Sequence, residues 1–311
     1  MPLVYGSTTD CMDKPFSIFN IELTNHCIMN CVMCPRTNNM TRERGYISLD
    51  LYKKAVDELL ECNPGLIDTD ILWLHHFGES LLHPEFGVCI RYASDKNIRT
   101  GLSINPIMLN DETIDTLLSA RPHTLYISLD GHDDESFYRI RGMKNAYGPS
   151  RERLIAFLRK KIESKSKAVI VLSMIDFDLN TRSIELTRRY WESMPGIDQF
   201  LPKSFTTWDG SATDVNCLLG TGKPPLVDKS SVRCTWPWER MTIVWDGDVV
   251  PCCFDYDKKY VLGNIKESRL IDIWNGEKIQ QLRNEFISNS VRNPLCVNCE
   301  RLYLTCDSIK P

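Results

Sequence analysis

The sequence predicts an α/β protein: a partial (β/α)6 barrel followed by a small C-terminal unit. Apolar segments of strand length alternate with amphipathic segments of helix length over residues 16–202, which is the pattern of βα units around a parallel sheet. Beyond residue 203 the alternation stops, and a short cysteine-dense tail closes the chain. Because six units fall short of the eight that close a full barrel, we expect an open barrel with its chemistry at the carboxyl ends of the strands.

Each element follows from its own apolar pattern. The predicted strands are Ser17–Leu23, Ile71–Phe77, Ile98–Ile104, Thr124–Leu129, Ala168–Ile175 and Asp198–Leu201. The predicted helices are Ser48–Glu61, Pro84–Ser94, Asp111–Ser119, Ser150–Ser164 and Thr181–Ser193. A hairpin over residues 241–254 is expected to turn at Asp246-Gly247, and one helix is expected over residues 270–286. The predicted parts are an N-terminal extension (1–15), the barrel (16–203), a Gly- and Pro-punctuated linker or lid (204–233) and a C-terminal β-hairpin and helix unit (234–311).

Composition excludes several classes of function. The chain has 311 residues, of which 42% are hydrophobic and 25% charged, as is ordinary for a soluble globular protein. No apolar run approaches the roughly 18 residues of a membrane span, and the start does not resemble a secretory signal, so we expect a cytoplasmic protein without a membrane partner. A net charge of −4 with interspersed signs argues against nucleic acid as the partner.

Thirteen cysteines are unusual in a compartment that keeps thiols reduced, so metal or cluster ligation explains them better than disulfides. Cys27, Cys31 and Cys34 follow the first predicted strand with the spacing C-x3-C-x2-C. Three thiolates on one loop can hold three corners of a [4Fe-4S] cube and leave one iron open for another ligand. A zinc knuckle or chance clustering is the competing interpretation.

This motif resembles that of the radical S-adenosylmethionine (SAM) superfamily, in which the open iron chelates the amino and carboxylate groups of SAM. The resemblance implies that the enzyme reductively cleaves SAM to a 5′-deoxyadenosyl radical, which abstracts a hydrogen atom from an unactivated carbon. Phe77-Gly78-Glu79 is similar to the family's GGE element, with its first glycine missing, and Glu79 is expected to receive the SAM ammonium. Further SAM-contacting candidates implied by the resemblance are Met33, Ser103, Asn105, Ser128, Asp130 and Arg141.

Arg141 would pair with the SAM carboxylate as a two-pronged donor. For each polar candidate the alternative is a cap or turn at a strand end. His75 and His76 fit a half-buried strand equally well.

The second cysteine group resembles the twitch form of the SPASM auxiliary domain. The resemblance makes Cys234, Cys252, Cys296 and Cys299 the four ligands of a second [4Fe-4S] cluster. A saturated cluster cannot chelate SAM, so it would support the fold, transfer electrons or position the substrate. Zinc bound by the same thiolates is the alternative. Cys306 is expected to be a spare thiol or a backup ligand.

Small relatives with a twitch domain act on carbohydrates and aminocyclitols, which implies a small polar substrate and a carbinol carbon as the reacting centre. Epimerisation of that carbon is our first expectation, and oxidation to a ketone, with the auxiliary cluster as electron acceptor, is the alternative. A flavodoxin or ferredoxin is the expected reductant. Peptide modification follows, although few residues precede the first strand to hold a leader-binding domain. A non-catalytic cluster or zinc scaffold is the remaining possibility.

Epimerisation needs a hydrogen donor on the face opposite the adenosyl radical. Cys253 is our first candidate, because in a strand it points away from its neighbour Cys252. A buried hydrophobic role is the alternative for Cys253. Cys217, in the irregular stretch, is the second candidate.

Overall fold

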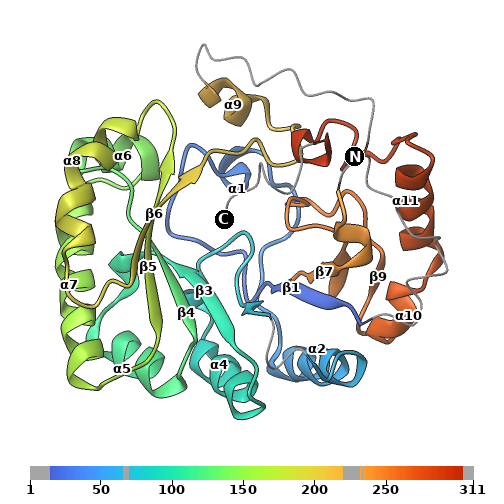
Figure 1. The fold of residues 1–311 in the computed structure, drawn as a ribbon, viewed down its shortest axis with the longest axis horizontal. Coiled ribbons are helices and arrows are strands. Elements are labelled where there is room, and N and C mark those ends of the chain that lie inside the picture. Colours follow the sequence, from blue (N-terminus) through green and yellow to red (C-terminus); the bar gives the residue numbers. More distant parts are fainter. Residues whose placement is uncertain (1–14, 66–69, 220–231, 233, 304–311) are drawn as a thin grey trace.

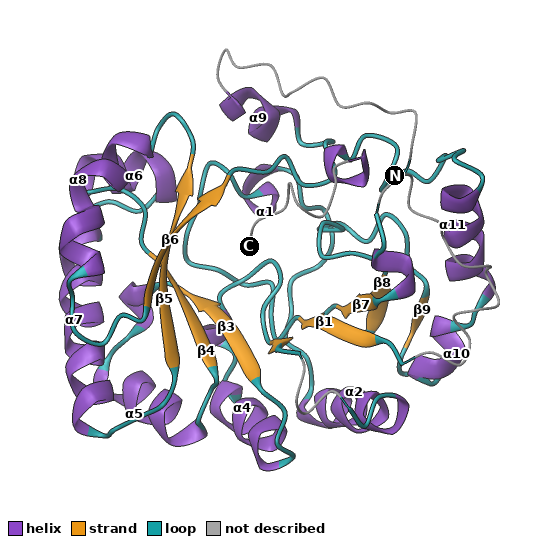
Figure 2. Cartoon of the chain, viewed as in Figure 1, coloured by secondary structure: helices purple, strands orange, loops and turns teal. Residues whose placement is uncertain are grey.

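One nine-stranded sheet runs through the protein in the order β6-β5-β4-β3-β2-β1-β7-β8-β9 (Figures 1 and 2). The computed structural model describes residues 15–65, 70–219, 232 and 234–303. Strands β1 to β6 pair in parallel, which confirms the predicted partial barrel. The strands are β1 (Ser17–Ile21), β2 (Leu72–Trp73), β3 (Thr100–Ile104), β4 (Thr124–Ser128), β5 (Val169–Asp176), β6 (Gln199–Ser204), β7 (Arg240–Ile243), β8 (Asp248–Val250) and β9 (Gly263–Asn264).

Helices follow the parallel strands and cover the outer side of the sheet (Figure 2). Apolar side chains of the central strands, among them Leu102, Leu125 and Ile170, are fully buried beneath them. The long helices of this part are α2 (Leu49–Cys62), α4 (Phe86–Asp95), α5 (Asp111–Ala120), α6 (Asp134–Arg141), α7 (Tyr147–Glu163) and α8 (Thr181–Glu192). Five of the six match the predicted helices within a few residues.

Helix α6 was not predicted from the sequence. Its residues are mostly polar, and its only buried apolar side chains are those of Phe137 and Ile140. Local bonds define its ends instead: Asp133 and Ser136 form a capping box at the start, and Gly142 ends the helix at φ 73°. This helix brings Arg141 to the carboxyl edge of the sheet.

The C-terminal unit continues the barrel sheet. The predicted hairpin forms, with its turn at Asp246-Gly247, and its first strand β7 pairs in parallel with β1, Ser17 opposite Arg240 and Ile21 opposite Ile243. The predicted single helix over 270–286 is instead two helices, α10 (Leu270–Trp274) and α11 (Glu277–Ile287). Gly276 is the N-cap residue of α11 in an extended conformation, which interrupts the helical path.

The described part of the predicted linker lies against the loop that follows β1. It contains α9 (Thr213–Asn216) and the 3-10 helix η3 (Cys217–Leu219). The indole N–H of Trp208 donates to the carbonyl of Met33 at 3.0 Å, and the carboxylate of Asp214 accepts from the side-chain amides of Asn38 and Asn39. Residues 220–231 of the linker, the N-terminal extension up to residue 14 and Cys306 lie outside the described residues.

Among the described residues, no helix is long and apolar enough to cross a membrane.

Candidate active site

The loop after β1 gathers the first three candidate ligands. Cys31 is buried, and Cys27 and Cys34 are half-buried. Burial and the nearby Glu79 and Cys31 raise the pKa of the Cys27 thiol to about 11, and burial with the neighbouring Cys31 raises that of Cys34 to about 12. Thiols that close together, in a loop closed by a hydrogen bond from the Cys34 N–H to the Cys31 carbonyl, have the donor chemistry of an iron-sulfur site. The bound metal would supply the charge that stabilises the thiolates.

The turn after β2 (residues 75–79) packs directly on this loop. A Cβ added to Gly78 would stand 2.1 Å from the carbonyl oxygen of Thr24, so a glycine is required at this position. The N–H of Glu79 donates to the carbonyl of His26 at 2.8 Å. Phe77, in the place of the missing glycine, packs its ring on Trp208 and Tyr256 at 4.9 and 5.9 Å. The missing first glycine therefore does not disturb the contact with the cysteine loop.

Glu79 is a buried carboxylate held by Asn105. The backbone and side-chain N–H groups of Asn105 donate to Oε2 of Glu79 at 2.8 and 3.0 Å, and the N–H of Leu81 donates to Oε1. Burial raises the pKa of Glu79 to about 7. Asn105 Oδ1 is buried and has no hydrogen-bond partner among the described residues. A bound ammonium beside Glu79 would both restore its charge and give this oxygen a donor, which fits a SAM site.

A cavity of about 290 Å³ opens beside the cysteine loop at the carboxyl ends of β3 to β6. Met33, Ser103, Ser128 and Arg141 line it, and the hydroxyls of Ser103 and Ser128 are 3.2 Å apart. Glu79 and Asn105 are not among the residues that line this cavity. The structure thus brings four of the sequence-predicted SAM candidates to one cavity.

Arg141 and Asp130 form a buried ion pair. Asp130 also accepts from the N–H of Ile175 and the amide of Asn180, at 2.7 and 2.6 Å. The guanidinium of Arg141 lies 3.6 Å from Sγ of Cys31. Asp130 is fully buried and does not line the cavity, so its position in this structure is that of a partner that orients Arg141.

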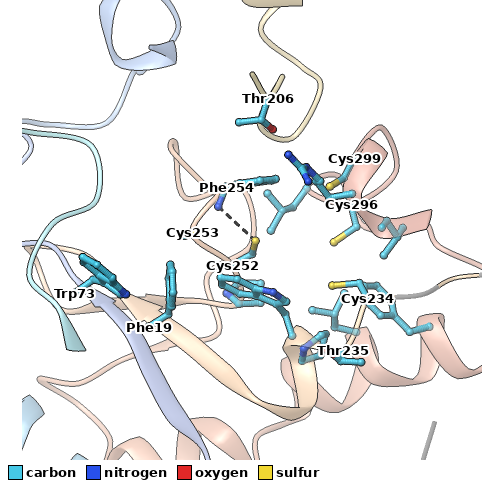
Figure 3. Close-up of a pocket in the computed structure, with 18 of the residues that line it drawn as sticks. Phe19, Trp73, Thr206, Cys234, Thr235, Cys252, Cys253, Phe254, Cys296 and Cys299 are labelled. Atoms are coloured by element: carbon cyan, nitrogen blue, oxygen red, sulfur yellow. Dashed lines mark hydrogen bonds between the residues drawn. The ribbon is translucent and has the colours of Figure 1, made fainter. Parts of the chain in front are cut away.

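The four C-terminal cysteines line one end of a larger cavity of about 520 Å³ (Figure 3). They come from three separate segments: Cys234 precedes the 3-10 helix η4 (Trp236–Trp238), Cys252 follows β8, and Cys296 and Cys299 precede the 3-10 helix η5 (Glu300–Tyr303). Burial and the mutual proximity of the thiols raise the pKa of Cys234 and Cys296 well above the usual value, and that of Cys299 to about 12. Four converging thiols fit a saturated cluster.

Strand geometry predicts that Cys253 points away from Cys252, and the structure contradicts this prediction. Strand β8 ends at Val250, Pro251 follows, and both cysteines lie in a turn. Their side chains contact each other, and this contact and burial raise the pKa of Cys252 well above the usual value. Cys253 lines both cavities. Cys217 is exposed in η3 and lines neither cavity.

The two cavities meet at residues that mostly were not predicted from the sequence. The residues that line both are Phe19, His75, Lys203, Thr206 and Cys253, and we call them the shared chamber. The sixth predicted strand ends at Leu201, whereas β6 continues to Ser204, so Lys203 lies within the strand and not at the predicted domain boundary. A strand end two residues later would have placed Lys203 at the catalytic edge of the sheet.

Two side chains of the shared chamber have shifted pKa values. Nδ1 of His75 accepts a hydrogen bond from the N–H of Ser103 at 3.1 Å, and burial, aided by the charge of Lys203, lowers the pKa of His75 to about 3. His75 is therefore neutral, with its proton on Nε2. Burial also lowers the pKa of Lys203 to about 8, with Asp130 and Arg141 acting in opposite directions.

A buried charge cluster joins the two cysteine regions. Glu22 accepts both guanidinium N–H groups of Arg42 at 2.6 Å, and the backbone N–H of Phe77 at 3.1 Å. Burial opposes ionisation of Glu22, but Arg42 and His76 lower its pKa to about 2. Nε2 of His76 lies 2.7 Å from the carbonyl oxygen of Cys253. Glu22 and His76 therefore fix the Cys253 turn relative to the loop after β1.

Two family models match the chain. The radical SAM superfamily model matches residues 21–188, and the model of the iron-sulfur cluster-binding domain called SPASM matches residues 234–300. Together they contain the three cysteines of the loop after β1 and the five cysteines that line the larger cavity.

Similar proteins cover nearly all of the chain. The tungsten-containing aldehyde ferredoxin oxidoreductase cofactor-modifying protein of Pyrococcus furiosus is 25% identical over 93% of this chain and 88% of its own length. The S-adenosyl-L-methionine-dependent 2-deoxy-scyllo-inosamine dehydrogenase of Niallia circulans is 21% identical over 94% of this chain and 95% of its own. The structure of BtrN in complex with AdoMet and 2-DOIA superposes with a TM-score of 0.60 at 20% identity, covering 92% of this chain and 94% of BtrN.

Proposed function

Because the chain belongs to the radical SAM superfamily, we propose that this enzyme removes a hydrogen atom from a carbinol carbon of a small substrate and completes the reaction as an oxidation to a ketone. When bound, SAM with its cluster supplies an adenosyl radical that accepts the hydrogen atom, and the auxiliary cluster supplies a one-electron acceptor. The residues that would hold these groups are Cys27, Cys31 and Cys34 for the first, and Cys234, Cys252, Cys296 and Cys299 for the second.

The shared chamber carries this proposal. Its five residues contact the cavity beside the first cysteine loop and also the cavity that holds the auxiliary cysteines. A substrate held there would lie between the cavity beside the first cysteine loop and the cavity lined by the auxiliary cysteines. Its reacting carbon would face the SAM side, and the auxiliary electron acceptor would lie on the other side of the substrate. The chain's own contribution is orientation: it holds the reacting carbon and excludes water and other hydrogen donors.

The redox balance requires three transfers. The carbinol carbon loses a hydrogen atom, and the resulting substrate radical must then lose one electron and one proton to become a ketone. A cluster held by Cys234, Cys252, Cys296 and Cys299 would take up this electron. The proton leaves the substrate hydroxyl and can pass to solvent through the hydroxyl of Thr206, which lines both cavities.

The dehydrogenase of Niallia circulans supports oxidation over our first expectation from sequence, epimerisation. One observation keeps epimerisation as the second candidate: Cys253 lines both cavities, and a thiol is a suitable hydrogen donor. Its contact with Cys252 also allows a purely structural role.

Turnover in deuterium oxide separates the two reactions. The reconstituted enzyme is incubated without oxygen with SAM, dithionite and a set of cyclitols, and 5′-deoxyadenosine, ketone and deuterium are measured. Oxidation yields ketone and 5′-deoxyadenosine in equal amounts, without deuterium at the reacting carbon. An inverted alcohol with one deuterium, lost in Cys253→Ala, would replace oxidation by epimerisation. Absence of 5′-deoxyadenosine would contradict both reactions.

A further inference from the structure

We propose that the shared chamber selects a small ring-bearing substrate with an anionic group, a carboxylate or a phosphate, and that Lys203 is the residue that binds this group. The inference rests on the proposed function only in that it places the substrate in the chamber. It differs from what the aminocyclitol-acting relative suggests, because an aminocyclitol carries a cationic amine.

The charges around the chamber carry the first step. Among the residues that the structure describes, no Asp or Glu lines either cavity, whereas Lys203, Arg141 and Arg301 do. Asp130, whose negative charge acts to raise the pKa of Lys203, is already held by Arg141, Asn180 and the Ile175 N–H. A cationic amine would thus find no carboxylate in the chamber, and its desolvation would be uncompensated.

The position of Lys203 carries the second step. Arg141 already has Asp130 as its partner, but the ammonium of Lys203 lies over the ring of Tyr126, 3.9 Å from its centroid. Tyr126 in turn stacks on Trp73 with ring centroids 4.9 Å apart. This contact holds the ammonium in place at the chamber while leaving its hydrogen-bond donors to a ligand. Most molecules carry the charge at neutral pH, because the pKa of Lys203 is about 8.

The remaining lining explains the ring. Phe19 and Trp73 line the barrel end of the larger cavity, away from Cys234, Cys296 and Cys299 (Figure 3). Aromatic faces of this kind pack against the apolar face of a ring, while Thr206 and His75 offer hydroxyl and Nε2–H groups to its hydroxyls. An anchor at one end of the ring would fix which carbinol carbon faces the SAM side.

The charge of Lys203 has two alternative roles, which the experiment separates from anion binding. The ammonium could offset the negative charge of the auxiliary site, or it could bind the carboxylate of SAM. Neither role makes binding of a substrate depend on the substrate's own charge.

The test uses four rings of similar size with the SAM-bound, reconstituted enzyme. The probes are myo-inositol (neutral), quinate (carboxylate), myo-inositol 1-phosphate (phosphate) and 2-deoxy-scyllo-inosamine (cationic), and the dissociation constant of each is measured by calorimetry. We expect at least one anionic probe to bind more tightly than the neutral and cationic ones, and quinate against the phosphate shows which anion is preferred. In Lys203→Met the preferred anion should bind about ten- to a hundredfold more weakly, with myo-inositol changed less than about threefold.

Two further variants make the result specific. Lys203→Glu should reverse the preference toward 2-deoxy-scyllo-inosamine. Thr206→Val, which changes the same chamber without changing its charge, should weaken all four probes by similar factors. The proposal is overturned if no probe shows a charge preference, or if Lys203→Met weakens SAM binding, or if it alters only the potential of the auxiliary cluster. These outcomes are measured by binding alone, so they can be interpreted even if the enzyme does not oxidise a carbinol. If the cationic probe is converted to a ketone and no probe shows a charge preference, the proposed function stands and the anion anchor is rejected.

Discussion

The two cysteine regions are built in opposite ways. The first is a single loop, residues 27–34, whose three thiols are gathered by local hydrogen bonds and by the tight approach of Gly78. The second takes its four thiols from the segment before η4, the end of the β7-β8 hairpin and the tail before η5. The first region is therefore largely predetermined by neighbours in sequence, and the second exists only where β7 has joined β1. We expect the two to differ in chemistry and in dependence on the fold.

Removal of each thiol set is the strongest test of this difference. We expect the reconstituted protein to bind about eight irons as two four-iron clusters. Each of two variants should bind about four: one with Ala in place of Cys27, Cys31 and Cys34, and one with Ala in place of Cys234, Cys252, Cys296 and Cys299. Only the first variant should lose 5′-deoxyadenosine formation completely, since the open iron that binds SAM belongs to that set. Iron analysis and chromatography of the product measure both effects.

The second variant should also have a lower thermal unfolding midpoint, because its four ligands connect distant segments. A wild-type protein with about four irons and stoichiometric zinc would contradict the two-cluster assignment.

The charge cluster between the two regions is expected to have the next largest effect. Glu22→Gln leaves the buried guanidinium of Arg42 without its counter-charge, so the free energy of unfolding should fall by about 3–5 kcal/mol. Glu192→Gln, which breaks the exposed pair with Arg188, is the matched control and should change it by about 0.5 kcal/mol or less. Anaerobic urea unfolding followed by circular dichroism compares the two variants, and equal effects would mean that the cluster does not hold the regions together.

The same carboxylate gives a pH dependence. In the folded protein the pKa of Glu22 is about 2, below its ordinary 4.5. Its contribution to stability is therefore fully present above about pH 4.5 and is lost as the pH falls toward 2. Glu22→Gln should lack this part of the acid sensitivity when both proteins are unfolded by urea at pH 3 and pH 6.

The smallest of the three effects is expected at Glu79. Its carboxylate should receive the SAM ammonium in a charge-assisted hydrogen bond, so Glu79→Ala should bind SAM about ten- to a hundredfold more weakly with unchanged iron content. Glu85→Ala, a few residues away and exposed, is the control and should bind SAM like the wild type. Unchanged SAM affinity in Glu79→Ala would leave Glu79 with its contacts to Asn105 and Leu81 as its role.

Local patterns explain which elements could be predicted. The six parallel strands have apolar runs that repeat their period without help from distant residues, and the C-x3-C-x2-C loop follows directly after β1. Helix α6 escaped prediction because caps rather than an apolar stripe define it, and the helix over 270–286 was not split because a lone glycine is tolerated in many helices. The predicted orientation of Cys253 is wrong because β8 ends at Val250, before Pro251, so the alternation of side chains along a strand does not extend to Cys253.

By itself the sequence determined the parallel βα architecture and the C-x3-C-x2-C spacing after the first strand, since periodicity and short spacings depend on adjacent residues. The tertiary structure alone decided that β7 extends the barrel sheet at β1, that four thiols from three segments converge, and that Phe19, His75, Lys203, Thr206 and Cys253 meet between two cavities. These residues come from distant strand ends and loops, and nothing in their local sequence encodes their distance. Only the pairing of strands across the whole sheet brings their side chains to one chamber.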